Sequence, residues 1–197
     1  MQTISNILFW ISNGLLVPVV ILLLLFFVRA IVLAAGFFGE YYRRKTILQA
    51  TKFINSACRD DIVKGIGALA EQPGCIYVDR LKDMLAHHDN AAYCERLVSN
   101  YEVDAAKELS GSRILMKLGP MLGLMGTLIP MGPALVGLAA GDISSMAYNM
   151  QVAFATTVVG MLIAAVGVAT LQVRQRWYAR ELNNLEYVKT ILCHEKE

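Results

Sequence analysis

Two long stretches of this chain are almost free of charge, and they constrain its fold more than any other feature. Residues 1–39 contain one charged side chain, Arg29, and residues 118–173 contain one, Asp142. The remaining charges lie in residues 40–117 and 174–197. A soluble domain of this length cannot bury so much uncharged chain, whereas a bilayer accepts about 20 consecutive apolar residues as one helix. The pattern therefore predicts an integral membrane protein with charged segments in water.

The composition excludes two other classes of protein. Hydrophobic residues make up 56% of the chain and charged residues 17%. A disordered chain needs low hydrophobicity and a high net charge, so disorder is excluded. The net charge is +2, so the chain lacks the basic excess that binding to nucleic acid requires.

Three membrane-spanning helices are predicted, and each is long enough to cross a bilayer. They are residues 15–38, 118–141 and 150–173. The first is expected to be a retained helix rather than a signal peptide, because residues 1–14 contain no Lys or Arg. Only a short polar segment, residues 142–149, separates the second span from the third. These two spans are therefore expected to form an antiparallel hairpin.

Basic residues flank the predicted spans on one side only. They are Arg43, Arg44 and Lys45 after the first span, Arg113 and Lys117 before the second, and Arg174, Arg176 and Arg180 after the third. Cytoplasmic segments carry an excess of Lys and Arg, so this side is expected to be the cytoplasm. The expected topology is an external N-terminus at 1–14, a cytoplasmic helical domain at 39–117, an external turn at 142–149 and a cytoplasmic C-terminal helix at 174–197.

The charged segments show helical rather than strand-like spacing of apolar residues. Residues 40–72 carry this spacing up to Pro73-Gly74, which is expected to end the helix. A shorter helix is predicted around residues 81–85, and a third over residues 91–111. Residues 178–192 repeat the spacing in the C-terminal segment. The fold class is therefore an all-α integral membrane protein, with three transmembrane helices and long cytoplasmic helical extensions.

No motif of an enzyme or a metal centre is found in the sequence. It contains no glycine-rich phosphate loop, no nucleophile elbow and no paired carboxylates in a pocket-like context. His87, His88 and Cys94 lie near one another in the chain, but their spacing matches no zinc pattern. We therefore expect no enzymatic activity and no cofactor.

Small residues recur at helical spacing in both helices of the predicted hairpin, and such stripes allow close helix packing in lipid. Neither span contains Asp, Glu, Lys, Arg or His. A proton relay in lipid normally needs an ionisable group, which another chain would then have to supply. The threonine hydroxyls of the hairpin can donate and accept hydrogen bonds. A packing stripe with hydroxyls bonded to their own helix would explain the same spacing.

Two segments of the hairpin resemble motifs of the MotA/TolQ/ExbB proton channel family. Gly119–Leu128 (GPMLGLMGTL) resembles the second-helix motif of that family. Ala153–Met161 (AFATTVVGM) is similar to the third-helix motif, in which a threonine stands three residues before a glycine. The order of one helix, a large insert, a tight hairpin and a C-terminal extension is also similar. The three-span layout is closer to the TolQ and ExbB branch than to the four-span MotA branch.

The resemblance implies a stator or channel subunit of an ion-motive-force-driven motor in the cell (inner) membrane. A homo-oligomer, a pentamer in the family, would surround a single-span ExbD/TolR/MotB-like partner whose Asp carries H⁺ or Na⁺. The residues implied for the ion pathway are Thr127, Thr156, Thr157 and Gln151. Those implied for the pore or for helix packing are Gly119, Gly123, Gly126, Pro130, Gly160 and Ala164. The alternative is a non-conducting oligomeric membrane scaffold.

The sequence departs from the family pattern at three places. Val152 stands where many members have a glutamate, and the neighbouring Gln151 is expected to substitute by hydrogen bonding. Pro130 and Pro133 favour a kink in the second span. Arg29 lies inside the first span, where it either extends toward the cytoplasmic headgroups or faces a neighbouring subunit or a lipid headgroup.

Overall fold

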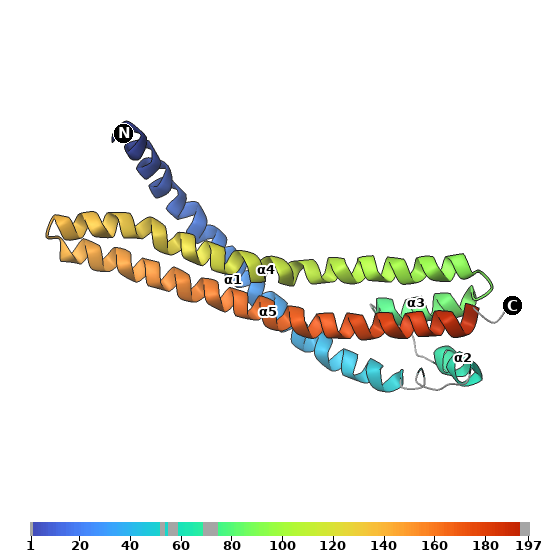
Figure 1. The fold of residues 1–197 in the computed structure, drawn as a ribbon. Helices are drawn as coiled ribbons and strands as arrows, with labels where there is room; N and C mark the ends of the chain where they lie inside the picture. Colours follow the sequence, from blue (N-terminus) through green and yellow to red (C-terminus); the bar gives the residue numbers. More distant parts are fainter. Residues whose placement is uncertain (1, 52–53, 55–58, 69–74, 194–197) are drawn as a thin grey trace. The chain divides into compact units, whose positions relative to one another are not determined.

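The computed structural model describes residues 2–51, 54, 59–68 and 75–193, and these residues contain helices and no strand. The helices are α1 (Gln2–Ala50), α2 (Arg59–Ala68), α3 (Ile76–Ala86), α4 (Ala91–Ala139) and α5 (Ile143–Cys193), in the order shown in Figure 1. Three of them contain stretches long and apolar enough to cross a membrane: Gly14–Arg44, Ala91–Ala139 and Ile143–Leu192. The predicted fold class, an all-α membrane protein, is confirmed.

The chain divides into two compact units, and the three long helices contribute to both. The first, here called the hairpin unit, contains Met1–Gly36 and Gly111–Leu171. The second, here called the charged unit, contains Phe37–Ser110 and Gln172–Glu197. The charge pattern of the sequence explains this division, because the hairpin unit contains nearly all of the uncharged chain.

Helix α4 joins two segments that the sequence analysis treated separately. A helix over 91–111 and a span from 118 were predicted, but one helix runs from Ala91 to Ala139. Gly111 is the only strong helix-disfavouring residue at the join, and a single glycine costs only about 1 kcal/mol within a helix. Pro120, Pro130 and Pro133 also lie inside α4 and do not end it. Transmembrane helices tolerate proline because neighbouring groups can satisfy the freed backbone atoms.

The opposite result holds for the helix predicted over residues 40–72, which is divided. Helix α1 ends at Ala50, and α2 begins at Arg59. Beyond the end of α1, the hydroxyl of Thr51 donates a 2.9 Å hydrogen bond to the carbonyl of Ile47. The predicted break at Pro73-Gly74 lies outside the described residues. In contrast, the end of α3 and the start of α4 lie where the sequence places them.

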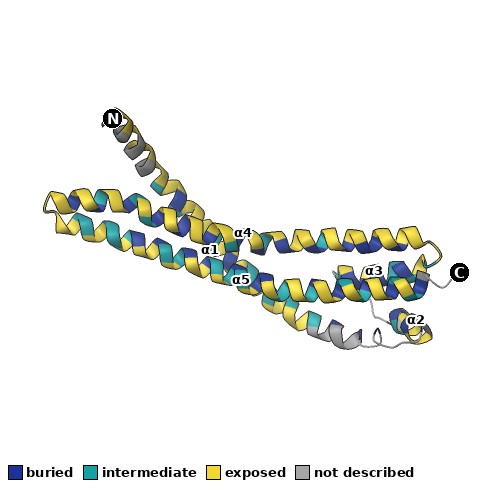
Figure 2. Ribbon diagram, in the orientation of Figure 1, coloured by how far each residue is buried: buried dark blue, intermediate teal, exposed yellow. Residues whose placement is uncertain are grey.

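The hairpin unit has a narrow core, and many residues along its helices are exposed (Figure 2). The core residues come from all three long helices: Val19, Leu23 and Ala30 of α1, Leu115 and Leu122 of α4, and Ile163 of α5. Many large apolar side chains of the same helices are exposed, among them Leu25, Leu128 and Phe154. Apolar surface of this extent is unusual for a soluble protein but is expected for helices that contact lipid.

A tight turn connects α4 to α5. Gly141 has a positive φ of 75°, a conformation that favours glycine. The backbone N–H of Asp142 donates to the carbonyl of Gly137 at 2.9 Å, which closes the end of α4. The Asp142 carboxylate accepts a 3.0 Å hydrogen bond from the backbone N–H of Ser145 and so caps the start of α5.

Candidate ion pathway in the helical hairpin

Glycines bring the backbones of α4 and α5 into direct contact. A Cβ atom on Gly160 would lie 2.7 Å from the carbonyl oxygen of Gly119 and 2.8 Å from the Cα of Gly123. A Cβ on Gly119 would lie 2.8 Å from the Gly160 oxygen and 3.0 Å from the backbone nitrogen of Ala164. Backbone atoms cannot rotate away as a side chain can. The small-residue stripes of the two helices therefore pack against each other within one chain.

A second contact in the hairpin involves a side chain. A Cβ atom on Gly126 would lie 2.6 Å from both Cβ and Oγ1 of Thr156. Thr156 is buried, and Pro130, one turn beyond Gly126, is fully buried as well. Gly126 therefore provides the space that the Thr156 side chain occupies between the helices.

The three hairpin threonines use their hydroxyl protons within their own helices. Thr127 Oγ1 donates to the Leu124 carbonyl at 2.7 Å. Thr156 Oγ1 and Thr157 Oγ1 both donate to the carbonyl of Ala153, at 2.9 and 3.2 Å respectively. A hydroxyl oxygen that donates in this way still has lone pairs that can accept. In this state each threonine is an acceptor toward its surroundings, and it can donate outward only after breaking its intrahelical bond.

The four polar residues implied for the ion pathway do not share one environment. Thr127 and Thr157 are half-buried, Thr156 is buried and Gln151 is exposed. Gln151 lies six positions before Thr157 on α5, which puts them about 9 Å apart along the axis and about 120° apart around it. Gln151 therefore does not lie on the helix face of Thr157.

Acidic and basic residues are absent from the body of the hairpin. Between residues 118 and 173 the only one is Asp142, which lies in the turn and caps α5. The hairpin can therefore offer hydroxyl and carbonyl oxygens to a proton-carrying group, but it has no carboxylate of its own along the two helices.

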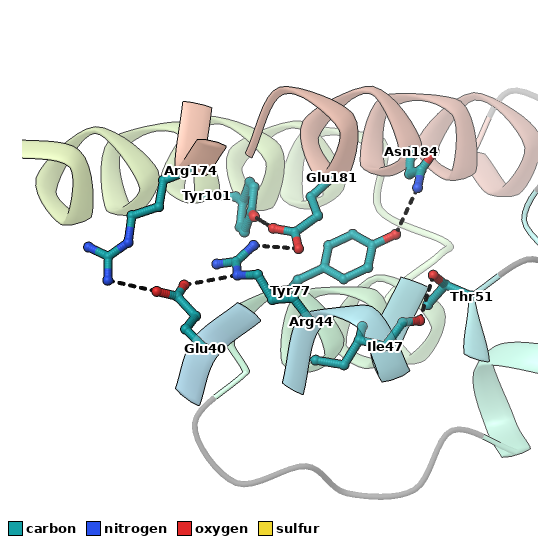
Figure 3. Close-up of polar contacts among 9 residues, drawn as sticks. All are labelled: Glu40, Arg44, Ile47, Thr51, Tyr77, Tyr101, Arg174, Glu181 and Asn184. Carbon is teal, nitrogen blue, oxygen red and sulfur yellow. Dashed lines mark hydrogen bonds and ion pairs between the residues drawn. The ribbon is translucent and has the colours of Figure 1, made fainter. Parts of the chain in front are cut away.

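The charged unit contains a buried polar network that the sequence analysis did not identify (Figure 3). Arg44 of α1 donates to Glu181 of α5 at 2.6 Å and to Glu40 at 2.9 Å. The hydroxyl of Tyr101 on α4 donates to the other carboxylate oxygen of Glu181. Arg174 of α5 pairs with Glu40 at 2.7 Å. The two arginines and two glutamates balance in charge and tie α1, α4 and α5 together within this unit.

Aromatic side chains surround the network. The Arg44 guanidinium lies 4.5 Å from the ring centroid of Tyr178 and 5.3 Å from that of Trp177. Trp177 is also stacked on Phe37, with 5.5 Å between the ring centroids. One sequence signal pointed to this site, because Glu181 interrupts the apolar face that Tyr178 and Leu185 share. An acidic residue on a buried face requires partners, but the sequence does not name them.

On α3, the Tyr77 hydroxyl accepts a 3.3 Å hydrogen bond from the amide of Asn184 (Figure 3). Tyr77 is almost fully buried. Burial raises the pKa of its phenol well above the usual value, because the charged phenolate would lose its hydration; the Asn184 hydrogen bond opposes this rise only in part.

The profile of the MotA/TolQ/ExbB proton channel family matches residues 76–187, which is more than half of the chain. The matched region contains α3, α4 and most of α5, including both threonine-bearing segments of the hairpin. No curated protein and no solved structure matches the chain significantly. This family consists of membrane transport proteins rather than enzymes. With its three apolar spans and all-α fold, the chain belongs to the MotA/TolQ/ExbB proton channel family.

Proposed function

We propose that this protein is the channel-forming stator subunit of a motor driven by proton or sodium flow. Several copies, five by analogy with the family, form a ring of helices around a single-span partner that carries an Asp. Ion flow past that Asp drives movement of the partner. The observation that carries this proposal is a hairpin with threonine hydroxyls and no ionisable group along its two helices, in a chain of a proton channel family.

Within the hairpin unit, α4 and α5 contain no carboxylate, and this is why the proposal includes a partner protein. A proton that crosses a hydrocarbon layer needs a group that can bind and release it. Hydroxyl oxygens can stabilise such a group but do not themselves titrate at physiological pH. The partner therefore supplies the titrating carboxylate, and the hairpin supplies its hydrogen-bonding surroundings.

The geometry of Thr127 and Thr157 suits the protonated form of that carboxylate. Both hydroxyls donate to carbonyls of their own helices, so their oxygens can accept from a carboxylic acid. When the acid releases its proton, a hydroxyl must rotate and donate to the resulting carboxylate, because an unpaired charge in low dielectric is costly. Each threonine is thus a two-position switch that follows the protonation state of the partner.

In this proposal copies of the chain meet through faces other than the small-residue stripes. Gly119, Gly123 and Gly160 already contact the opposite helix of the same chain. The exposed apolar residues of α4 and α5, such as Leu128 and Phe154, remain for contacts with lipid or with a second copy. In this proposal the protein lies in the inner membrane of the cell. Its N-terminus is outside, and the charged unit is in the cytoplasm.

The proposal is tested with Thr157→Val, which keeps the side-chain shape and removes the hydroxyl. Proton flux is measured in vesicles that contain the chain and its co-purifying single-span partner, at matched abundance. We expect flux to fall roughly 5- to 150-fold, which corresponds to about 1–3 kcal/mol for an unsatisfied buried polar group. Thr157→Ser should retain much of the flux, because it keeps the hydroxyl.

Thr190→Val is the matched control for this experiment. Thr190 makes the same type of bond, from its hydroxyl to the Glu186 carbonyl at 3.0 Å, but it lies in the charged unit. It should leave flux unchanged. Normal flux in both Thr157→Val and Thr127→Val would contradict the proposed role of the hydroxyls.

A non-conducting membrane scaffold is the second candidate, and one observation favours it. All three hairpin threonines are satisfied within their own helices, as purely structural threonines would be. The two functions differ in one measurement, because a scaffold would assemble with its partner without any flux driven by an imposed ion gradient.

A further inference from the structure

Arg29 occupies an unusual position in the hairpin unit. It is the only charged residue in the first 39, and its side chain is exposed. Its Nη2 atom lies 3.8 Å from the point where a Cβ on Gly111 of α4 would stand. Among the residues that the structure describes, none forms a hydrogen bond or ion pair with the guanidinium. An arginine next to lipid is costly to leave without an anion, so the missing partner needs an explanation.

The position of Gly111 along α4 indicates how deep the guanidinium lies. The uncharged part of α4 from Leu118 to Ala139 spans about 33 Å, close to the roughly 30 Å hydrocarbon core of a bilayer. Gly111 lies seven residues before Leu118, or about 10 Å farther along the axis. The Arg29 guanidinium beside Gly111 therefore lies at the level of the lipid headgroups, although its own Cα belongs to an apolar span.

The charges of the hairpin unit are separated between its two ends. Arg29, Arg113 and Lys117 are its only basic residues, and all three lie near the Gly111 end. Its only acidic residue, Asp142, lies at the other end, in the turn between α4 and α5. The unit therefore has no acid of its own that could neutralise Arg29. The anion that is abundant at headgroup level is the phosphate of a phospholipid.

We propose that Arg29, beside Gly111, forms a binding site for the phosphodiester group of a membrane phospholipid. A guanidinium presents a planar fork that binds two phosphate oxygens at once, and such charge-assisted bonds are strong. The acyl chains of the lipid would lie along the exposed apolar residues of α1 that share the helix face of Arg29, such as Leu22 and Leu25. The proposal does not depend on ion conduction, so it can fail or succeed separately from the proposed function.

The test is native mass spectrometry of the full-length chain titrated with dioleoylphosphatidylglycerol. Dioleoylglycerol, which lacks the phosphate, should bind at least about tenfold more weakly than the phospholipid. Arg29→Gln should weaken phospholipid binding by about 10- to 100-fold, the effect of losing charge-assisted hydrogen bonds. Arg29→Lys should give an intermediate loss, because lysine keeps the charge without the fork.

Arg113→Gln is the matched control. It removes one positive charge from the same end of the unit, but Arg113 lies about 160° around α4 from Gly111. General attraction to an anionic lipid is expected to change by no more than about fivefold. A second pair of variants tests the position: Gly111→Ala would make only an ordinary contact with Arg29 and should bind normally, whereas Gly111→Leu should weaken binding by filling the site.

Three results would overturn the proposal. Equal losses in Arg29→Gln and Arg113→Gln would show general attraction rather than a site. Displacement of the lipid by an equal concentration of inorganic phosphate would identify a free anion as the ligand. Unchanged lipid binding in Arg29→Gln, with release of a co-purifying protein, would show that the counter-ion is a protein carboxylate.

Discussion

Gly160 is the single residue on which the hairpin contact depends most directly. Its missing side chain faces the backbone oxygen of Gly119, and a Cβ would come within 2.7 Å of it. We expect Gly160→Ala to destabilise the protein by about 1–3 kcal/mol, because the helices must separate. The control is Gly36→Ala, where no atom lies within 4 Å, and where alanine should be neutral or stabilising by up to about 1 kcal/mol. Thermal unfolding in detergent measures the stability of both variants. Equal unfolding midpoints would contradict the close contact of α4 and α5 at Gly160.

The three hairpin threonines show what spacing predicts at the scale of a residue. The sequence predicts that small residues line one face of each helix, because that follows from a fixed rotation of 100° per residue. It did not separate Thr156 from Thr157, although Thr156 is buried against Gly126 and Thr157 is only half-buried. That difference depends on the depth of the contact between the helices, which no local pattern encodes. The roles of both threonines in ion flow remain predictions.

Among contacts between helices, the ion pair of Arg44 on α1 with Glu181 on α5 is the one whose effect on stability can be tested most directly. Arg44→Met leaves the buried Glu181 carboxylate with only the Tyr101 hydroxyl, and we expect a loss of about 3–5 kcal/mol. The double variant Arg44→Met, Glu181→Leu removes both charges and should lose clearly less than the sum of the two single variants. The free energy of unfolding is measured by chemical denaturation, monitored by circular dichroism, for the unmodified protein, the two single variants and the double variant. Strictly additive losses would show that the two residues are not coupled.

The contact between α3 and α5 is expected to weaken in alkali. Burial raises the pKa of Tyr77 above its unfolded value of about 10. The folded state therefore retains the phenol proton more strongly, and its stabilising effect is complete below pH 10 and is lost as the pH rises above it. Tyr77→Phe should reduce the fall in melting temperature between about pH 9 and pH 11. An identical alkaline profile in both proteins would argue against a buried neutral phenol.

At the scale of elements, periodicity predicted where helices exist better than where they end. The start of α4 and the C-terminal half of α3 follow from apolar spacing and the turn residues between them, whereas α3 begins at Ile76, ahead of the predicted residues 81–85. The join at Gly111 and the division after Ala50 did not follow, because glycine is tolerated inside a packed helix and no proline marks the end of α1. The Glu40–Arg44–Glu181 network could not be predicted either, since it joins residues up to 137 positions apart.

For the whole molecule, the distribution of basic residues leads to a test of topology. In a background without cysteines, we expect Ser144→Cys to react with an impermeant reagent from outside the cell. Asp60→Cys and Thr190→Cys should react only after the membrane is opened; all three positions are exposed in the structure. Labelling of residue 144 only from the cytoplasmic side would reverse the proposed orientation.

The short turn at Gly141 and Asp142 also bears on how such a chain enters a bilayer during synthesis. Asp142 satisfies a free backbone group at each helix end: its N–H donates to the Gly137 carbonyl of α4, and its carboxylate accepts from the Ser145 N–H of α5. Less unpaired backbone therefore has to be carried across. In the proposed topology, the Asp142 carboxylate is the only charged side chain of the hairpin that must cross, at a cost of about 2.5–3.5 kcal/mol by insertion scales. The long apolar stretches on both sides offset that cost many times over. We therefore expect the two helices to enter the membrane as one pair instead of one after the other.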